Sequence, residues 1–177
     1  MTSPASGHQT GSSATSGSTR GCVNGLNRYA WQTKTLEICS RASGACAPVR
    51  APKSEHTLDP AWSPDGKTLA FIEAPASSAA GFPQPVVARW YAMHTLWTLR
   101  TSSRAAHKIT GTHGATAPVW SSDGKSLVYE AGEALWLVPA LPGKPVKIAW
   151  PLFPPTSWPT YYGQVDWTEQ FAWSAAS

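Results

Sequence analysis

The chain has 177 residues, of which 42% are hydrophobic, 14% are charged and 11% are aromatic, with ten Trp. This length predicts one domain, the aromatic content argues against a wholly disordered chain, and 16 Pro with 14 Gly favour short elements over a helical bundle. The net charge of +4 lies within residues 1–58, where six Lys or Arg outnumber two Glu. No concentrated basic stripe exists, so we expect no nucleic-acid partner, and no apolar run is long enough for membrane insertion.

The N-terminal residues have the composition of a linker. Residues 1–21 are almost entirely Ser, Thr, Gly, Ala and Pro. Such a segment cannot offset the entropy lost on ordering, so we expect residues 1–27 to be flexible and disordered. No apolar core of a signal peptide is visible. A chain that opens on a linker leads us to expect an anchor or a further domain upstream, or a reading frame that starts late.

Three cysteines follow, at positions 22, 39 and 46. The spacing of Cys39 and Cys46 does not fit a metal knuckle. If residues 36–39 and 46–49 pair as a hairpin, the two sulfurs could form a disulfide, which would place the chain outside the cytosol. Two unbonded buried thiols are an equally good interpretation, and Cys22 is left over in both.

An internal repeat organises the rest of the chain. Residues 59–73 read Asp-Pro-Ala-Trp-Ser-Pro-Asp-Gly-Lys-Thr-Leu-Ala-Phe-Ile-Glu, and residues 117–131 read Ala-Pro-Val-Trp-Ser-Ser-Asp-Gly-Lys-Ser-Leu-Val-Tyr-Glu-Ala. The two copies align at an offset of 58. Each predicts a β-hairpin in which Asp and Gly form the turn and apolar residues at period two form the buried face. The turn residues are Asp65, Gly66, Asp123 and Gly124, and the core residues are Trp62, Leu69, Phe71, Trp120, Leu127 and Tyr129.

A second hairpin follows each copy. Leu36 precedes Val49 by thirteen residues, Leu96 precedes Ile109 by thirteen, and Leu135 precedes Ile148 by thirteen. Short polar or Gly/Pro-containing stretches separate the members of each pair. One repeat therefore has four strands.

This repeat resembles the TolB-type β-propeller repeat, a relative of WD-type repeats, on the Trp-Ser-Pro-Asp-Gly-Lys-Thr-Leu-Ala-Phe of residues 62–71 and the matching residues 120–129. The resemblance implies an all-β, partial β-propeller of four-stranded antiparallel blades over residues 28–174. Two blades are full and two are partial. The full blades are residues 58–110 and 116–149, and the partial blades are residues 28–49 and 163–174.

The partial blades are assigned from shorter patterns. Residues 28–31, 36–39 and 46–49 match the last three strands of a blade whose first strand is missing, and residues 165–168 and 171–173 match the first two strands of another. Closed propellers have about four to eight blades. We therefore expect a fragment of a longer propeller, with assembly from several chains and an open stack as alternatives.

Two irregular segments are candidates for binding. Residues 74–95 and 150–162 are long and rich in aromatics, and long loops on rigid scaffolds often carry binding residues. The opposing interpretation, which is the stronger one for the first segment, is that Trp90 and Tyr91 begin the next strand and pack between blades. The candidate binding residues are Arg89, Trp90, Tyr91, Trp158, Tyr161 and Tyr162.

Signatures of catalysis are scarce. The sequence has no nucleophile elbow, phosphate loop or zinc-protease motif, and the Asp-Gly turns lack the further carboxylates of a calcium loop. The five His are expected at the surface. We therefore expect no catalytic residue, no metal and no cofactor.

The leading hypothesis for function is a non-catalytic binding module, not an enzyme, that contacts a protein or peptide, or the remaining blades of a longer propeller. The resemblance to TolB-type proteins implies an extracytoplasmic location, periplasmic or at the cell surface. The alternative is that these blades belong to a larger enzyme or sensor, such as a prolyl-oligopeptidase-type peptidase or a membrane kinase. Carbohydrate binding through exposed aromatics is a further alternative.

Overall fold

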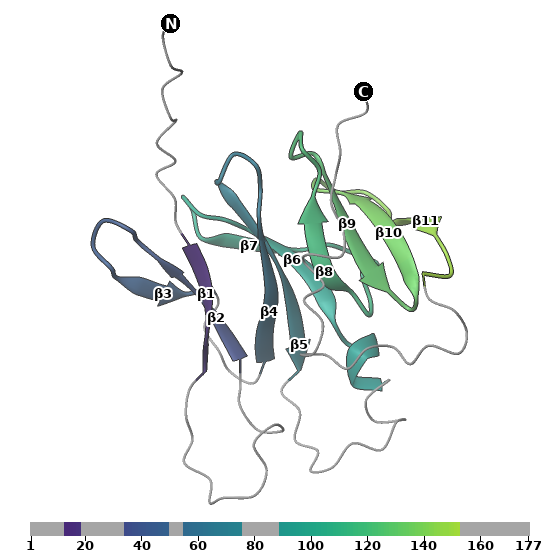
Figure 1. The fold of residues 1–177 in the computed structure, drawn as a ribbon, viewed down its shortest axis with the longest axis horizontal. Helices are drawn as coiled ribbons and strands as arrows, with labels where there is room; N and C mark the ends of the chain where they lie inside the picture. The colour runs from purple at the N-terminus through teal and green to yellow at the C-terminus, as the bar shows by residue number, and fades with distance from the viewer. Residues whose placement is uncertain (1–12, 19–33, 50–54, 76–88, 153–177) are drawn as a thin grey trace, which may run out of the picture.

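The computed structural model describes residues 13–18, 34–49, 55–75 and 89–152, and nearly all of its regular elements are β-strands. Three antiparallel sheets follow one another along the chain (Figure 1). One helical turn, over residues 89–92, interrupts them. Within the described segments no helix has the length and apolar character needed to cross a membrane. The expected all-β class is confirmed.

The second sheet is the blade expected at residues 58–110. Its strands pair in chain order, and they are β4 (Glu55–Trp62), β5 (Thr68–Pro75), β6 (Thr95–Arg100) and β7 (Ala105–Lys108). Side chains on both faces of β5 are buried, because Leu69 and Phe71 pack toward the first sheet while Ala70 and Ile72 pack toward the third. This sheet is therefore the centre of the stack.

The third sheet is the blade expected at residues 116–149. Its strands also pair in chain order, and they are β8 (Thr116–Trp120), β9 (Ser126–Ala131), β10 (Ala134–Pro139) and β11 (Val146–Ala149). Two consecutive four-stranded antiparallel sheets that pack face to face form a partial β-propeller.

The Asp-Gly turns of the two copies have the same geometry. Asp65 Oδ1 accepts a hydrogen bond from Ser63 Oγ at 2.6 Å and one from Lys67 N at 3.0 Å. Asp123 accepts the equivalent bonds from Ser121 and Lys125 at the same distances. These hydrogen bonds, with that of the serine first, lower the pKa of both carboxyls. The glycines that follow have φ of 67° and 69°, which the turn requires and glycine adopts without strain.

Both first strands carry a β-bulge that the sequence pattern does not predict. The register shifts between Leu58 and Ala61 in β4, and between Thr116 and Val119 in β8. Asp59 and Ala117 occupy the bulges with φ of 48° and 47°, a conformation that costs energy for residues other than glycine. The repeat therefore extends to an irregular feature of the backbone.

Two apolar cores hold the three sheets together. The core between the second and third sheets contains most of the predicted apolar residues of the second copy, and its principal members are Leu58, Ala70, Ile72, Leu96, Trp120, Leu127, Tyr129 and Val138. The core between the first and second sheets consists of Leu36, Val49, Leu69, Phe71 and Leu99, with Trp62 and Trp97 packed against it. Burial of these side chains, each contributing roughly 1.5–3 kcal/mol when complete, is the main source of stability.

The first sheet differs from the expected partial blade at one strand. Its order is β1 (Ser13–Ser18), β2 (Lys34–Cys39) and β3 (Cys46–Pro48). β1 lies within the segment expected to be a linker, and it takes the place beside β2 that we expected for residues 28–31. β1 forms a strand because its backbone pairs with β2 along six residues, which its polar composition does not predict. Residues 28–31 and the final partial blade, residues 163–174, lie outside the described residues.

The thirteen-residue spacing marks an antiparallel hairpin in all three cases, and in two of them a backbone hydrogen bond joins the two residues at this spacing. Val49 N donates to Leu36 O, and Ile109 N donates to Leu96 O, both at 2.8 Å. The third case is different, because the pairing of β10 with β11 shifts between Leu135 and Trp136. Ile148 is consequently 47% exposed, whereas Val49 and Ile109 are buried.

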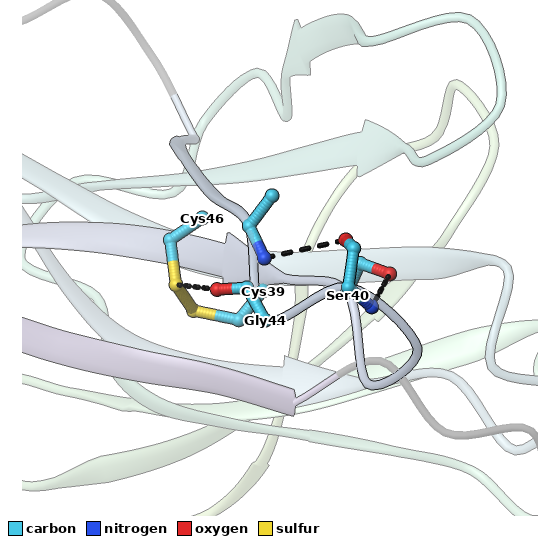
Figure 2. The surroundings of a disulfide bond; sticks show 6 residues. Cys39, Ser40, Gly44 and Cys46 are labelled. Carbon is cyan, nitrogen blue, oxygen red and sulfur yellow. Dashed lines mark hydrogen bonds between the residues drawn. A yellow bond between two sulfur atoms is a disulfide. The ribbon is translucent and has the colours of Figure 1, made fainter.

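The hairpin of β2 and β3 carries a disulfide. Cys39 and Cys46 face each other in the ladder, with Cα atoms 3.9 Å apart, and their sulfurs are bonded. Figure 2 shows the bond beside the turn, where the Cys46 sulfur lies 3.6 Å from the Gly44 carbonyl oxygen. Ser40 N donates to Ala45 O and Gly44 N donates to Ser40 O, each at 2.8 Å, and these bonds close the turn. The disulfide interpretation of the two cysteines is therefore the one that the structure supports.

Candidate functional site

An aromatic cluster forms where the first long loop returns to the second sheet. The helical turn over residues 89–92 ends in hydrogen bonds from Met93 N to Trp90 O at 3.0 Å and from His94 N to Tyr91 O at 2.9 Å. This turn sets the rings of Trp90, Tyr91 and His94 against one another, with centroids 4.3–5.3 Å apart. His56 on β4 completes the cluster, 6.2 Å from Trp90.

Trp90 anchors this cluster to the sheet. Its Nε1 donates to Pro75 O, at the end of β5, at 2.8 Å, and its ring packs against the core between the second and third sheets. The expectation that Trp90 and Tyr91 begin a strand is wrong, because both lie in the helical turn. The expectation that Trp90 packs between blades holds. The hydrogen bond and the packing of Trp90 therefore hold the end of the first long loop against the second sheet.

His94 is the most buried titratable group of the cluster. Its side chain is fully buried, which corrects the expectation that all histidines lie at the surface. The pKa of His94 is lowered to about 4, chiefly by burial and to a smaller extent by the nearby His56, while a hydrogen bond with the backbone of Ala115 acts in the opposite direction. His94 is therefore neutral near pH 7.

The remaining predicted binding residues divide into two groups. Arg89 is exposed and Tyr91 is half-buried, both on the helical turn. Trp158, Tyr161 and Tyr162 lie outside the described residues. Among the predicted binding residues that the structure describes, Arg89 is therefore the one with an exposed side chain, and its turn is held in place by the hydrogen bond of the neighbouring Trp90.

A second exposed group lies on β11 and at the start of the candidate segment 150–162, and only its Trp150 falls within that prediction. On β11 and just after it, Lys147 Nζ lies 5.2 Å from the ring centre of Trp136 and 5.7 Å from that of Trp150. Trp150 is 65% exposed. Its apolar neighbours on this edge, Val146 and Ile148, are also exposed. The apolar side chains at period two, Val146, Ile148 and Trp150, are the signal in the sequence that indicates this group.

Among residues 13–18, 34–49, 55–75 and 89–152, no three or more His, Cys, Asp or Glu gather in a way that could hold a metal ion. The expectation of no cofactor stays a prediction.

Comparison with known proteins identifies one curated relative with a similar sequence. No protein-family model matches the chain. An uncharacterized peptidase, YuxL, from Bacillus subtilis (strain 168) is 32% identical over 97 residues, which cover 54% of this chain and 12% of the relative. The match thus spans about an eighth of the length of that peptidase.

Several solved structures resemble the fold at low identity. The β-propeller domain of the trilobed protease from Pyrococcus furiosus has a TM-score of 0.45 at 17% identity, over 65% of this chain and 34% of that one. An oligogalacturonate lyase in complex with manganese has a TM-score of 0.49 at 12% identity, over 69% of this chain and 30% of that one. A prolyl endopeptidase has a TM-score of 0.47 at 15% identity, over 67% of this chain and 18% of that one. Similarity at this level says nothing about chemistry.

The similarity to a peptidase corrects our leading hypothesis. We expected a non-catalytic binding module and not an enzyme, and the sequence similarity to YuxL contradicts both statements. It favours the alternative in which the blades are part of an enzyme. The error has a physical origin, since repeated turns and core residues report a scaffold and carry no information about chemistry elsewhere in a protein.

Proposed function

We propose that this chain supplies blades of the β-propeller of a peptidase. The observation that carries the proposal is the 32% identity to a peptidase across 54% of the chain. The repeat supports it as well, because TolB-type blades form the kind of stacked scaffold that can flank a peptidase active site. The remaining blades of that propeller are then the partner of the sheets described above.

The test is to isolate the native polypeptide from its own cells with an antibody against residues 89–152 and to measure hydrolysis of a panel of fluorogenic peptides. We expect hydrolysis that elutes with the antigen and that antibody depletion removes. A preparation from cells that lack the gene is the control. Absence of hydrolysis across the panel, with intact polypeptide present, would refute the proposal.

Within this function we propose that Arg89 contacts the peptide substrate or an adjacent part of the enzyme. Its side chain is exposed and its neighbour Trp90 is fixed by the bond to Pro75. Exposed arginines on rigid supports are common binding determinants. Arg89→Ala should raise KM roughly two- to tenfold with little effect on kcat. Arg100→Ala, which removes an exposed arginine at the end of β6, is the matched control and should leave KM unchanged.

We also propose an extracytoplasmic location, which the disulfide between Cys39 and Cys46 supports because such bonds persist in oxidising compartments. The measurement is thiol alkylation in intact cells, followed by mass spectrometry. We expect both cysteines to react only after reduction. Reaction of both without reductant would contradict this location.

A further inference from the structure

One face of the third sheet is apolar and only partly covered. Val119 pairs with Val128, and Val128 pairs with Leu137, so that three neighbouring strands contribute adjacent side chains. Strand alternation turns these residues away from the second sheet, since Trp120, Leu127 and Val138 face it. Of the three, only Val128 is buried.

The second sheet shows how the equivalent face is covered. Ala70 occupies the position of Val128, and Leu96 occupies that of Leu135, in matching registers. Both are 0% exposed, because the third sheet packs over them. The same face on the third sheet has its apolar residues but lacks such cover within the described residues.

A hydrogen bond accompanies this packing of one sheet on the next. Trp120, the last residue of β8, donates from Nε1 to Ala61 O in β4 at 2.9 Å. The bond therefore links the first strand of the third sheet to the first strand of the second sheet. Trp62 holds the same position one repeat earlier. Its Nε1 is buried with no acceptor in the described residues, where the first sheet has no strand equivalent to β4. The bond therefore belongs to the contact between consecutive sheets.

We propose that residues 163–174 of this chain pack on the open face of the third sheet, with Trp167 Nε1 donating to Val119 O. Residues 165–168, Val-Asp-Trp-Thr, lie where the sequence pattern predicts the first strand of a further blade, and a hydroxyl residue follows their Trp as it follows Trp62 and Trp120. Val119 directly precedes Trp120, as Ala61 directly precedes Trp62. The carbonyl of Val119 is therefore equivalent to the carbonyl of Ala61, which accepts the bond from Trp120. Phe171 and Trp173, at period two, supply the apolar side chains that would cover Val128 and Leu137.

The chain leaves the third sheet at a suitable place. Leu152 N donates to Glu133 O at 2.9 Å, which holds it beside the turn between β9 and β10. This is the end of the sheet at which β8 begins, because Thr116 pairs with Glu130. Residues 153–164 then lie between this point and the proposed strand. Twelve residues reach up to about 40 Å, well beyond the roughly 10 Å between packed sheets.

The charges on the two surfaces are compatible with contact. Glu130, the acidic residue on this face, accepts hydrogen bonds from Thr116 Oγ1 at 2.7 Å and from Glu133 N at 3.0 Å. Its carboxylate thus has partners within its own sheet. Residues 163–174 contain no Lys or Arg and two acidic residues. Asp166 alternates with Trp167 and would therefore point away from the third sheet, and Glu169 would lie in the connection between the two proposed strands, so the docking would bury neither a cation nor a carboxylate against Glu130.

The proposal does not depend on peptidase activity, and carbene footprinting of the full chain tests it. In the unaltered protein, Val119, Val128 and Leu137 should label weakly, and Trp167→Ala should raise their labelling about threefold or more as the cover is released. Trp150→Ala, which removes an exposed tryptophan from the preceding segment, is the control and should leave the three residues unchanged.

Amide exchange provides the second measurement and checks folding. Amides of residues 164–173 should be protected in the full chain, and Leu137→Asp should abolish that protection while β4 to β7 stay protected. Strong labelling of the three residues before any substitution, or exchange of residues 164–173 at the rate of an unstructured peptide, would overturn the proposal. Protection that disappears on dilution would assign the cover to a second copy and would overturn it too.

Discussion

The carboxylate of Asp59 accepts a hydrogen bond from the backbone N of Ala117 at 3.0 Å, and these two residues occupy the same bulge in consecutive first strands. The bond therefore joins equivalent points of two repeats. It lies beside the indole bond from Trp120 to Ala61. Together the two bonds fix the first strands of the second and third sheets to each other.

Asp59→Ala should destabilise the protein by about 1–3 kcal/mol, since it removes this acceptor and places alanine at a positive φ. Asp59→Asn keeps both an oxygen and a side chain that tolerates this conformation, so it should cost much less. Urea unfolding followed by circular dichroism measures both. Equal destabilisation by the two substitutions would contradict the assigned role.

Trp120→Phe should cost more than Trp62→Phe, although the two tryptophans hold equivalent positions. The first substitution removes a donor that is bonded to Ala61 O, and the lost hydrogen bond costs about 0.5–1.5 kcal/mol beyond the loss of ring area. The second removes a donor that has no acceptor in the described residues. The measurement is the denaturant midpoint of each variant, compared at equal m values. A midpoint for Trp120→Phe that is no lower than the midpoint for Trp62→Phe would contradict the prediction.

Stability should fall as the pH drops from about 6.5 to about 4, because the folded protein holds His94 with its pKa lowered to about 4 while the unfolded chain binds a proton at its ordinary value of 6.5. Protonation then favours the unfolded state, by roughly 3 kcal/mol at most. His94→Phe should flatten this part of the profile.

Reduction of the bond between Cys39 and Cys46 should loosen β2 and β3 before the other sheets. The closed loop is short, with a sequence separation of 7, so the loss is roughly 2 kcal/mol by the loop-entropy argument. Amide exchange with and without reductant reports it. We expect faster exchange in residues 34–49 and little change in residues 116–149, and the variant with both cysteines replaced by serine should behave like the reduced protein.

The sequence predicts the regular parts of this fold well, for a physical reason. Asp65 and Asp123 bond their own turns, and Leu69 and Leu127 are each followed by an aromatic residue two positions later on the same face, so the information is local. β1 escapes prediction because its order comes from pairing with β2, while Ser, Thr, Gly and Ala give no apolar alternation. The bulge at Asp59 escapes it too, since neither Asp nor Ala117 signals positive φ reliably.

The candidate site is less accessible to such reasoning. The exposure of Arg89 and the packing of Trp90 depend on a helical turn inside a long loop, and the burial of His94 depends on residues from β4 and from the loop before β8. No local pattern encodes these contacts. The relation to a peptidase rests on similarity to another protein, which turns and hydrophobic periodicity do not reveal.

Hydrogen bonds join the second and third sheets along one edge, where β4 and β8 lie. The hydrogen bonds from Ala117 N to the Asp59 carboxylate and from Trp120 Nε1 to Ala61 O both join β8 to β4. The far strands, β7 and β11, stand at the opposite margins of their sheets (Figure 1). These bonds hold the edges at β4 and β8 together. We therefore expect the easiest relative motion of the two sheets to be a separation of β7 from β11, with the edge at β4 and β8 acting as the hinge.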